Sequence, residues 1–189
     1  MRILGIDPSP TGATWALLDD EGNVFRAATE PIDEILEWLR DMKFQTEVAI
    51  EMPASYGMAV GVEVFETCEI VGRLHQASLL RGMPVYRYYR NTIKLHMCGQ
   101  SNANDANIRQ SLIDRYGPTK ELAIGRKATP GPLYGFAADD WAALAVAVTH
   151  LDRRGDKAVD IGKELERKRT ARADKMRKRA AKKQSEVVT

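Results

Sequence analysis

Residues 1–12, MRILGIDPSPTG, contain a short hydrophobic run that ends at Asp7 and is followed by two prolines and a glycine. The run is typical of a buried strand, and the prolines and glycine indicate that the chain turns directly after it. Asp7 has two interpretations at this point. An aspartate before a proline often forms a turn, whereas an aspartate at the end of a buried strand can serve as an acidic ligand. The other carboxylates of the chain have to decide between them.

The pattern of the first 150 residues predicts a sheet covered by helices. Three strands come first and form an antiparallel meander, because residues 20–23, DEGN, are a hairpin turn signal. The strands are expected at 2–7, 13–19, 24–29, 46–52 and 84–89. The helices are expected at 32–43, 62–82, 104–116 and 137–151. Residues 117–136 are rich in glycine and proline and are expected to form a loop. The predicted class is α/β, a five-stranded mixed sheet flanked by helices.

The charge of the chain is unevenly divided. The net charge of the 189 residues is +2, but residues 151–189 hold 14 Lys and Arg against 7 Asp and Glu, a charge of +7, which leaves −5 on residues 1–150. Residues 167–183 hold ten basic residues and one acid, Asp174. We therefore expect one domain over 1–153 and a basic helical or disordered tail over 154–189. Such a tail is typical of proteins that bind polyanions, although it can also serve solubility alone.

Composition argues against several classes of protein. The chain has no apolar stretch near the roughly 18 residues of a membrane span, and its first residues do not read as a signal peptide. We expect an intracellular protein without membrane contact. Cys68, in a helical pattern, and Cys98, in a loop-like stretch, lack the CxxC spacing of zinc sites, and a disulfide framework is not indicated. A sugar-kinase or actin-like ATPase also begins with a strand and an Asp turn, but it needs two such domains. No small-molecule cofactor is expected.

Three groups of acids occupy positions typical of a site. Glu51 follows a buried strand just as Asp7 does, and Asp139 and Asp140 begin an apolar helix. Helix capping explains an acid at a helix start, but ligand sites of open α/β sheets form at the carboxyl ends of strands. Carboxylates without His or Cys partners suit Mg²⁺ or Mn²⁺. Two such ions, roughly 3.5 to 4 Å apart, hydrolyse phosphodiesters in many enzymes. With the basic tail, these acids indicate a nuclease.

Four blocks of the chain resemble, in order, those of the RuvC family of Holliday-junction resolvases. The blocks are GIDPSPTGATWAL (5–17), AIEMP (49–53), PVYRYYRNTIK (84–94) and AADDWAALAVAVTH (137–150). The resemblance implies an RNase H-like fold, a homodimer, two Mg²⁺ ions in each site and cleavage of two opposed strands of a branched DNA. It also implies that Asp7 bridges both ions, that Glu51 and Asp139 are further ligands, and that Lys94 lies near the scissile phosphate.

The chain departs from the family pattern at two positions. Ala142 stands where the family usually has a second helix acid, three residues after the first. Asp140 is the alternative, but it lies about 100° round the helix from Asp139, so either acid remains a candidate ligand. A second family lysine falls within SNANDANI (101–108), where this chain has Asp105 and no basic residue.

Several other residues have both a structural and a functional interpretation. Tyr56 follows Glu51 and either stacks on an exposed base of a junction or is an ordinary surface tyrosine. His150 follows an apolar helix, and we expect a structural histidine there. His75 and His96 are distant from it in the sequence. The helix expected at 62–82 has one apolar face, which we expect to be core or dimer interface. This face consists of Val64, Cys68, Val71 and Leu74.

The leading functional prediction is a metal-dependent, structure-selective DNA endonuclease that resolves four-way junctions. It would recognise its substrate by backbone charge and shape, because the sequence contains no base-reading motif. One alternative is a related RNase H-like nuclease that acts on RNA or flap substrates. The other is a catalytically weakened nucleic-acid-binding protein of the same fold, which Ala142 keeps open.

Overall fold

The computed structural model describes residues 1–42, 45–55, 59–154 and 176–177. The chain divides into two units, Met1–Asp152 and Arg153–Thr189, and the first unit holds the sheet and its helices. Tyr56 and almost all of the predicted basic tail lie outside the described residues. The domain boundary expected after residue 153 stays a prediction.

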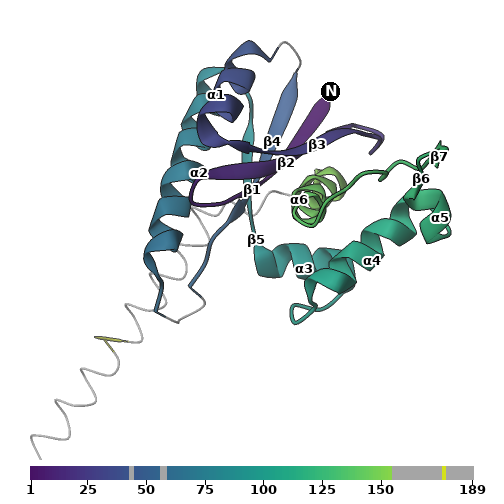
Figure 1. Ribbon diagram of the computed structural model, residues 1–189. Coiled ribbons are helices and arrows are strands. Elements are labelled where there is room, and N and C mark those ends of the chain that lie inside the picture. The colour runs from purple at the N-terminus through teal and green to yellow at the C-terminus, as the bar shows by residue number, and fades with distance from the viewer. Residues whose placement is uncertain (43–44, 56–58, 155–175, 178–189) are drawn as a thin grey trace, which may run out of the picture. The chain divides into compact units, whose positions relative to one another are not determined.

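The sheet has five strands in the order β3-β2-β1-β4-β5 (Figure 1). The strands are β1 (Arg2–Pro8), β2 (Gly12–Asp19), β3 (Val24–Pro31), β4 (Thr46–Met52) and β5 (Val85–Tyr89). Strands β1, β2 and β3 pair antiparallel, whereas β4 pairs parallel with both β1 and β5. The predicted mixed sheet is therefore confirmed. The opening hydrophobic run forms the central strand, and Ile3, Leu4 and Ile6 are fully buried.

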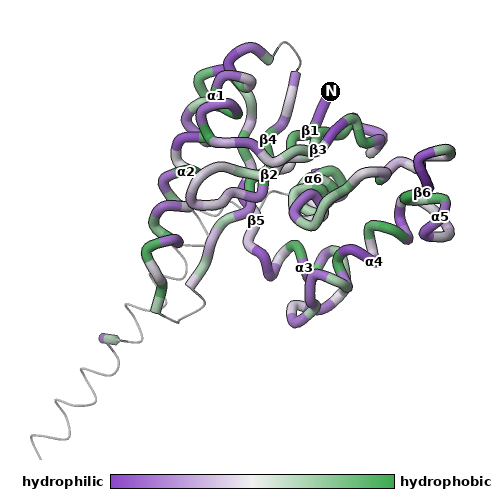
Figure 2. Tube along the Cα trace, viewed as in Figure 1, coloured by the Kyte–Doolittle hydropathy of each residue, from purple (hydrophilic) through white to green (hydrophobic). Residues whose placement is uncertain are grey.

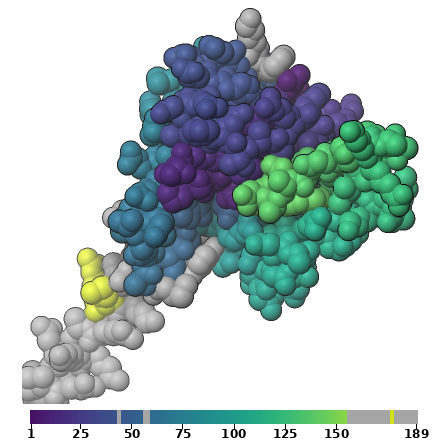
Figure 3. Space-filling view, viewed as in Figure 1, coloured from purple at the N-terminus to yellow at the C-terminus, as the bar shows by residue number. Residues whose placement is uncertain are grey.

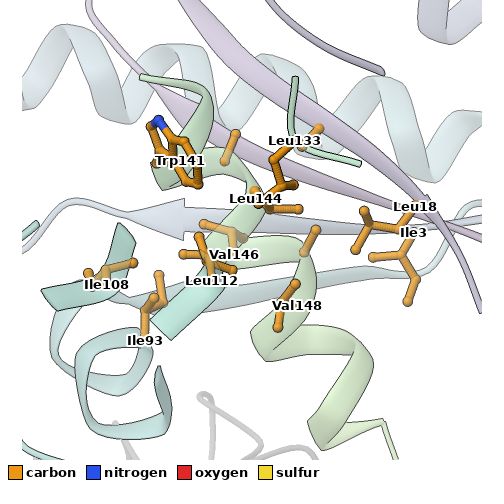
Figure 4. Close-up of a cluster of buried hydrophobic side chains, with 14 of the residues drawn as sticks. Ile3, Leu18, Ile93, Ile108, Leu112, Leu133, Trp141, Leu144, Val146 and Val148 are labelled. Atoms are coloured by element: carbon orange, nitrogen blue, oxygen red, sulfur yellow. The ribbon is translucent and has the colours of Figure 1, made fainter. Parts of the chain in front are cut away.

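Helices cover both faces of the sheet. They are α1 (Ile32–Asp41), α2 (Val62–Leu80), α3 (Arg90–Cys98), α4 (Asp105–Tyr116), α5 (Lys120–Ala123) and α6 (Asp140–Arg153). Because side chains alternate along a strand, Leu4 packs in the core under α1 and α2, and its neighbour Ile3 packs in the core of α3, α4 and α6. Figure 4 shows this second core, with Ile3 and Leu18 of the sheet beside the side chains of α6.

Small residues let α6 lie very close to the sheet. Gly5 of β1 pairs with Ala16 of β2 on one side and with Ala49 of β4 on the other. A Cβ atom added at Gly5 would lie 2.4 Å from the carbonyl oxygen of Ala143 and 2.6 Å from the Cβ of Ala147. Figure 3 shows green residues from the later part of the chain beside the purple residues of the N-terminal strands. Gly5 thus fixes the position of α6 over β1.

Three local expectations were wrong. Residues 90–98 form α3, so Cys98 ends a helix and does not lie in a loop. The expected loop at 117–136 contains α5 and a small hairpin of β6 (Gly125–Arg126) and β7 (Thr129–Pro130). The last helix starts at Asp140, because residues before it form a turn closed by the Asp140 side chain. Among the described residues, none of the helices has the length and hydropathy that a membrane crossing needs.

Candidate active site

The predicted acids of two strands lie together at one edge of the sheet. Strands β1 and β4 are parallel neighbours, so their carboxyl ends meet at this edge. Asp7 lies near the end of β1, and Glu51 lies near the end of β4. The two-residue alternation of strands places Asp7 on the same face as Gly5 and places Glu51 on the same face as Ala49. Both carboxylates therefore belong to the face that α6 covers.

Helix α6 brings Asp139 to the same edge. Ala143 packs on Gly5. Asp139 comes four residues earlier, so it lies about one helical turn nearer to Asp7 at the end of β1. Asp7 and Asp139 line one cleft of about 520 Å³. The cleft is completed by residues of α3, α4, the turn before α6 and the start of α6, namely Arg90, Asp105, Ala106, Ile108, Arg109, Phe136, Ala137, Ala138, Trp141 and Ala142.

Asp140 has a different environment from Asp139. Its side chain is buried, and one carboxylate oxygen accepts a hydrogen bond of 2.7 Å from the backbone N–H of Ala137. Asp139 is exposed on the cleft. Asp140 thus closes the turn that precedes α6, and Asp139 faces Asp7.

An arginine that the sequence analysis did not select joins the acids of this edge. Arg90 is the first residue of α3 and directly follows β5. Its Nη1 donates to Oε2 of Glu51 at 3.0 Å, and its Nη2 donates to Asp105 at the start of α4. The signal that could have found Arg90 is its position in the sequence. Arg90 directly follows β5, the strand next to β4, and Glu51 lies near the end of β4. Asp105 was noted only as a departure from the family pattern.

Asp7 and Glu51 are harder to ionise than ordinary carboxylic acids, because the pKa of each is raised. Burial, first, and then the negative charges of Glu51 and Asp139 together raise the pKa of Asp7 to about 7 against the opposing charge of Arg90. Burial also raises the pKa of Glu51, although Arg90 and Lys94 act in the opposite direction. Lys94 lies one turn after Arg90 on α3, and its charge lowers the pKa of Glu51. A group of carboxylates in this condition is stabilised by added positive charge.

The donor set suits a hard divalent cation. Asp7, Glu51 and Asp139 offer carboxylate oxygens, the ligands that Mg²⁺ prefers, and Ala142 adds none. Within the described ranges, however, no three His, Cys, Asp or Glu side chains are gathered closely enough to hold one ion. The ion pair between Glu51 and Arg90 is one reason, because the guanidinium occupies a carboxylate oxygen that a cation would need.

A second polar cluster lies on the same face of the sheet. His150 of α6 is 1% exposed, and its Nε2 lies 2.9 Å from Oε2 of Glu47 at the start of β4. Its Nδ1 lies 2.8 Å from the hydroxyl of Tyr88, and its ring lies against Tyr86. His150 is thus buried with both ring nitrogens paired, as the structural interpretation of this residue requires. His96 likewise pairs with Asp152.

Comparison with known proteins agrees with the fold and the sequence blocks. No family model matches the chain. The crossover junction endodeoxyribonuclease RuvC of Chloroflexus aggregans is 26% identical over 170 residues, which cover 79% of this chain and 92% of that protein. The resemblance to the RuvC family is confirmed.

Solved RuvC structures share the fold. The RuvC structure of Thermus thermophilus matches with a TM-score of 0.60 and 21% identity over 84% of this chain and 98% of that one. The T. thermophilus RuvC in complex with a Holliday junction substrate matches equally well, with 20% identity over 82% of this chain and 96% of that one. The RNase H-like architecture predicted for this chain is therefore confirmed.

Proposed function

We propose that this chain is a metal-dependent, structure-selective DNA endonuclease that resolves four-way junctions. The observation that carries the proposal is that Glu51 and Asp139 lie near enough to Asp7, at the carboxyl end of β1 in an RNase H-like sheet, to raise its pKa. A curated RuvC that acts on crossover junctions and a RuvC structure bound to a Holliday junction support the choice of substrate.

The charged residues in and around the cleft have distinct roles in this proposal. Asp7, Glu51 and Asp139 would hold Mg²⁺ or Mn²⁺, which supplies an activated water and stabilises the leaving oxygen of the phosphodiester. Asp140 holds the turn before α6 and so positions Asp139. Lys94 places a positive charge beside Glu51, where a phosphate would otherwise be repelled. Arg109, whose guanidinium lies 4.9 Å from the ring centroid of Trp141, lines the same cleft and can pair with backbone phosphate.

Paired cleavage requires two copies of this site, and we propose that α2 forms the dimer interface. Val71 and Leu74 in the second half of α2 are buried against the sheet, but Val62 and Phe65 in the first half are 66% and 63% exposed. Figure 2 shows hydrophobic residues recurring along this helix. A two-fold axis through such a face would relate two identical sites. Phe65→Glu should therefore yield a monomer by light scattering, whereas Phe25→Glu, at an exposed phenylalanine of β3, should not.

The substrate is tested with one set of synthetic nucleic acids. A four-way junction, a matched duplex, a flap and an RNA–DNA hybrid are incubated with the protein, with and without Mg²⁺. We expect cleavage of the junction alone, at opposed strands, and only with Mg²⁺. Preferred cleavage of the flap or the hybrid would favour the related RNase H-like nuclease.

One observation favours a second candidate function. Ala142 lines the cleft without a carboxylate, so the site has one acid fewer than the family pattern. A catalytically weakened junction-binding protein would bind the four-way junction tightly and would cut none of the substrates with Mg²⁺ or Mn²⁺. The same experiment separates the two candidates.

A further inference from the structure

Arg90 connects a half-buried acid with an exposed acid that lines the cleft. Its side chain is 23% exposed and pairs with Glu51, which is 13% exposed, and with Asp105, which is 81% exposed. An arginine can bond two carboxylates at once because its planar guanidinium carries five N–H donors. Arg90 thus has one partner inside the proposed metal site and another at the solvent side of the cleft.

The contact with Glu51 conflicts with metal binding. A divalent cation and a guanidinium compete for the same carboxylate, because two positive charges repel each other strongly where water is scarce. The acids of the described residues are also not grouped to hold an ion as they stand. Glu51 must therefore exchange Arg90 for the cation.

The contact with Asp105 does not conflict with metal binding in this way. Asp105 lies in the first turn of α4, where the helix dipole stabilises a negative charge. Asn104 and Asn107 fix this helix start by a reciprocal capping box. Asp105 is thus a carboxylate on a rigid support, placed to keep Arg90 at the cleft after it leaves Glu51.

We propose that Arg90 is an exchangeable counter-ion of Glu51 and that Asp105 retains it when a divalent cation binds. This inference rests on the proposed function. With no cation bound, Arg90 neutralises Glu51 and competes with metal. With a cation bound, Arg90 remains paired with Asp105 at the cleft, where its freed N–H donors can bind a DNA phosphate. Asp105 acts through Arg90 and is a positioning residue.

The affinity of the full-length protein for Mn²⁺, measured by calorimetry without DNA, tests the competition. Arg90→Gln should bind Mn²⁺ about fivefold more tightly than the wild type, because a competing charge is gone. Asp105→Asn should bind it about fivefold more weakly, because Arg90 is left with Glu51 alone. Arg109→Gln removes an equal charge from the same cleft but not from Glu51, and it should change the affinity less than about twofold.

The double variant separates positioning from direct ligation. If Asp105 acts through Arg90, adding Asp105→Asn to Arg90→Gln should weaken Mn²⁺ binding by less than about twofold. An undiminished fivefold effect of Asp105→Asn in both backgrounds would make Asp105 a ligand itself and would overturn its assigned role.

A second measurement uses the wild type and does not depend on how the variants fold. The side-chain Nε–Hε resonance of Arg90 should shift when Mg²⁺ is added, because its Glu51 contact is lost. An unchanged resonance at saturating Mg²⁺, or unaltered Mn²⁺ affinity in a folded Arg90→Gln, would overturn the proposal. If the wild type binds Mn²⁺ and Asp7→Asn does not, such a result contradicts only this inference. If Asp7→Asn binds Mn²⁺ like the wild type, the proposed function itself fails.

Discussion

Strand β4 carries a glutamate near each end, and the two have opposite surroundings. Glu47 and Glu51 are each 13% exposed, and they lie on the same face because they are four residues apart. Glu47 pairs with His150, a residue that also bonds Tyr88. Glu51 lies beside Asp7, whose pKa it raises, and it is paired with Arg90, which also bonds a third acid.

The difference separates a polar cluster whose groups are paired from one to which the proposed function assigns the chemistry. At the Glu47 end, His150 forms hydrogen bonds with both Glu47 and Tyr88. These bonds join α6 to strands β4 and β5 of the sheet. At the Glu51 end, negative charges are brought together at a cost, since burial and repulsion raise the pKa of Asp7 to about 7. Perturbed carboxylates in a cleft are characteristic of functional sites. Burial of an acid alone does not distinguish the two ends.

The largest expected effect is that of Asp7→Asn on cleavage. Removal of a carboxylate that the proposal assigns to both ions should lower the single-turnover cleavage rate of a four-way junction by at least about 10³-fold. Binding of the junction should persist, because the change removes negative charge near a phosphate. Gel-shift titration in Ca²⁺ provides the binding control. Cleavage near the wild-type rate would show that the Glu51 end is not the metal centre.

The next effect compares the two helix acids. Asp139→Asn should lower cleavage about a hundredfold, because it removes a carboxylate from the cleft. Asp140→Asn should leave cleavage within a few-fold but lower the free energy of unfolding by about 1 kcal/mol, because it weakens the bond to Ala137. Rates at saturating Mg²⁺ and urea unfolding provide both readouts. A larger loss of cleavage in Asp140→Asn than in Asp139→Asn would show that Asp140, and not Asp139, is the metal ligand.

The smallest effect is a dependence of stability on pH without metal. The unfolded pKa of Asp7 is near 3.8 and its folded pKa is about 7, so the folded state binds more protons between these values and loses stability as pH rises through them. In EDTA, Asp7→Asn should gain stability over the wild type, by about 2–3 kcal/mol more at pH 8 than at pH 5. Urea unfolding at the two pH values measures it. A variant less stable than the wild type at pH 8 would contradict the repulsion described for this end.

Much of the fold follows from local patterns in the sequence. Strands β1, β2, β4 and β5 and helices α1, α2, α4 and α6 could be predicted from their apolar runs or faces. Strand β3 has no buried residue and could be predicted because the turn signal at residues 20–23 precedes it. Helix α3 could not, because it follows β5 without a turn and only Ile93 of its residues is buried. The two-residue strands β6 and β7 are too short to carry a period of alternation.

The site could be predicted only in part, because side-chain directions depend on packing. Asp7, Glu51, Asp139 and Asp140 were selected as acids at the ends of buried elements, and Glu51 and Asp139 lie near enough to Asp7 to raise its pKa. The bond between Asp140 and the backbone of Ala137, which favours Asp139 as the ligand, could not be predicted, because no periodicity reveals it. Arg90 and Asp105 lie fifteen residues apart, and their pairing follows from how α4 packs beside α3.

The most direct test of the comparison is the cleavage rate of a four-way junction by two matched variants, Glu51→Gln and Glu47→Gln. Both remove one carboxylate charge from the same face of the same strand at equal exposure. At saturating Mg²⁺, Glu51→Gln should cut at least about 10³-fold more slowly than the wild type, because a metal ligand is lost. Glu47→Gln should cut within about threefold of the wild type while losing about 1–2 kcal/mol of stability, because only the bond to His150 is weakened. Equal losses of cleavage in the two variants, or normal cleavage by Glu51→Gln, would contradict the assignment of catalysis to the carboxyl edge of the sheet.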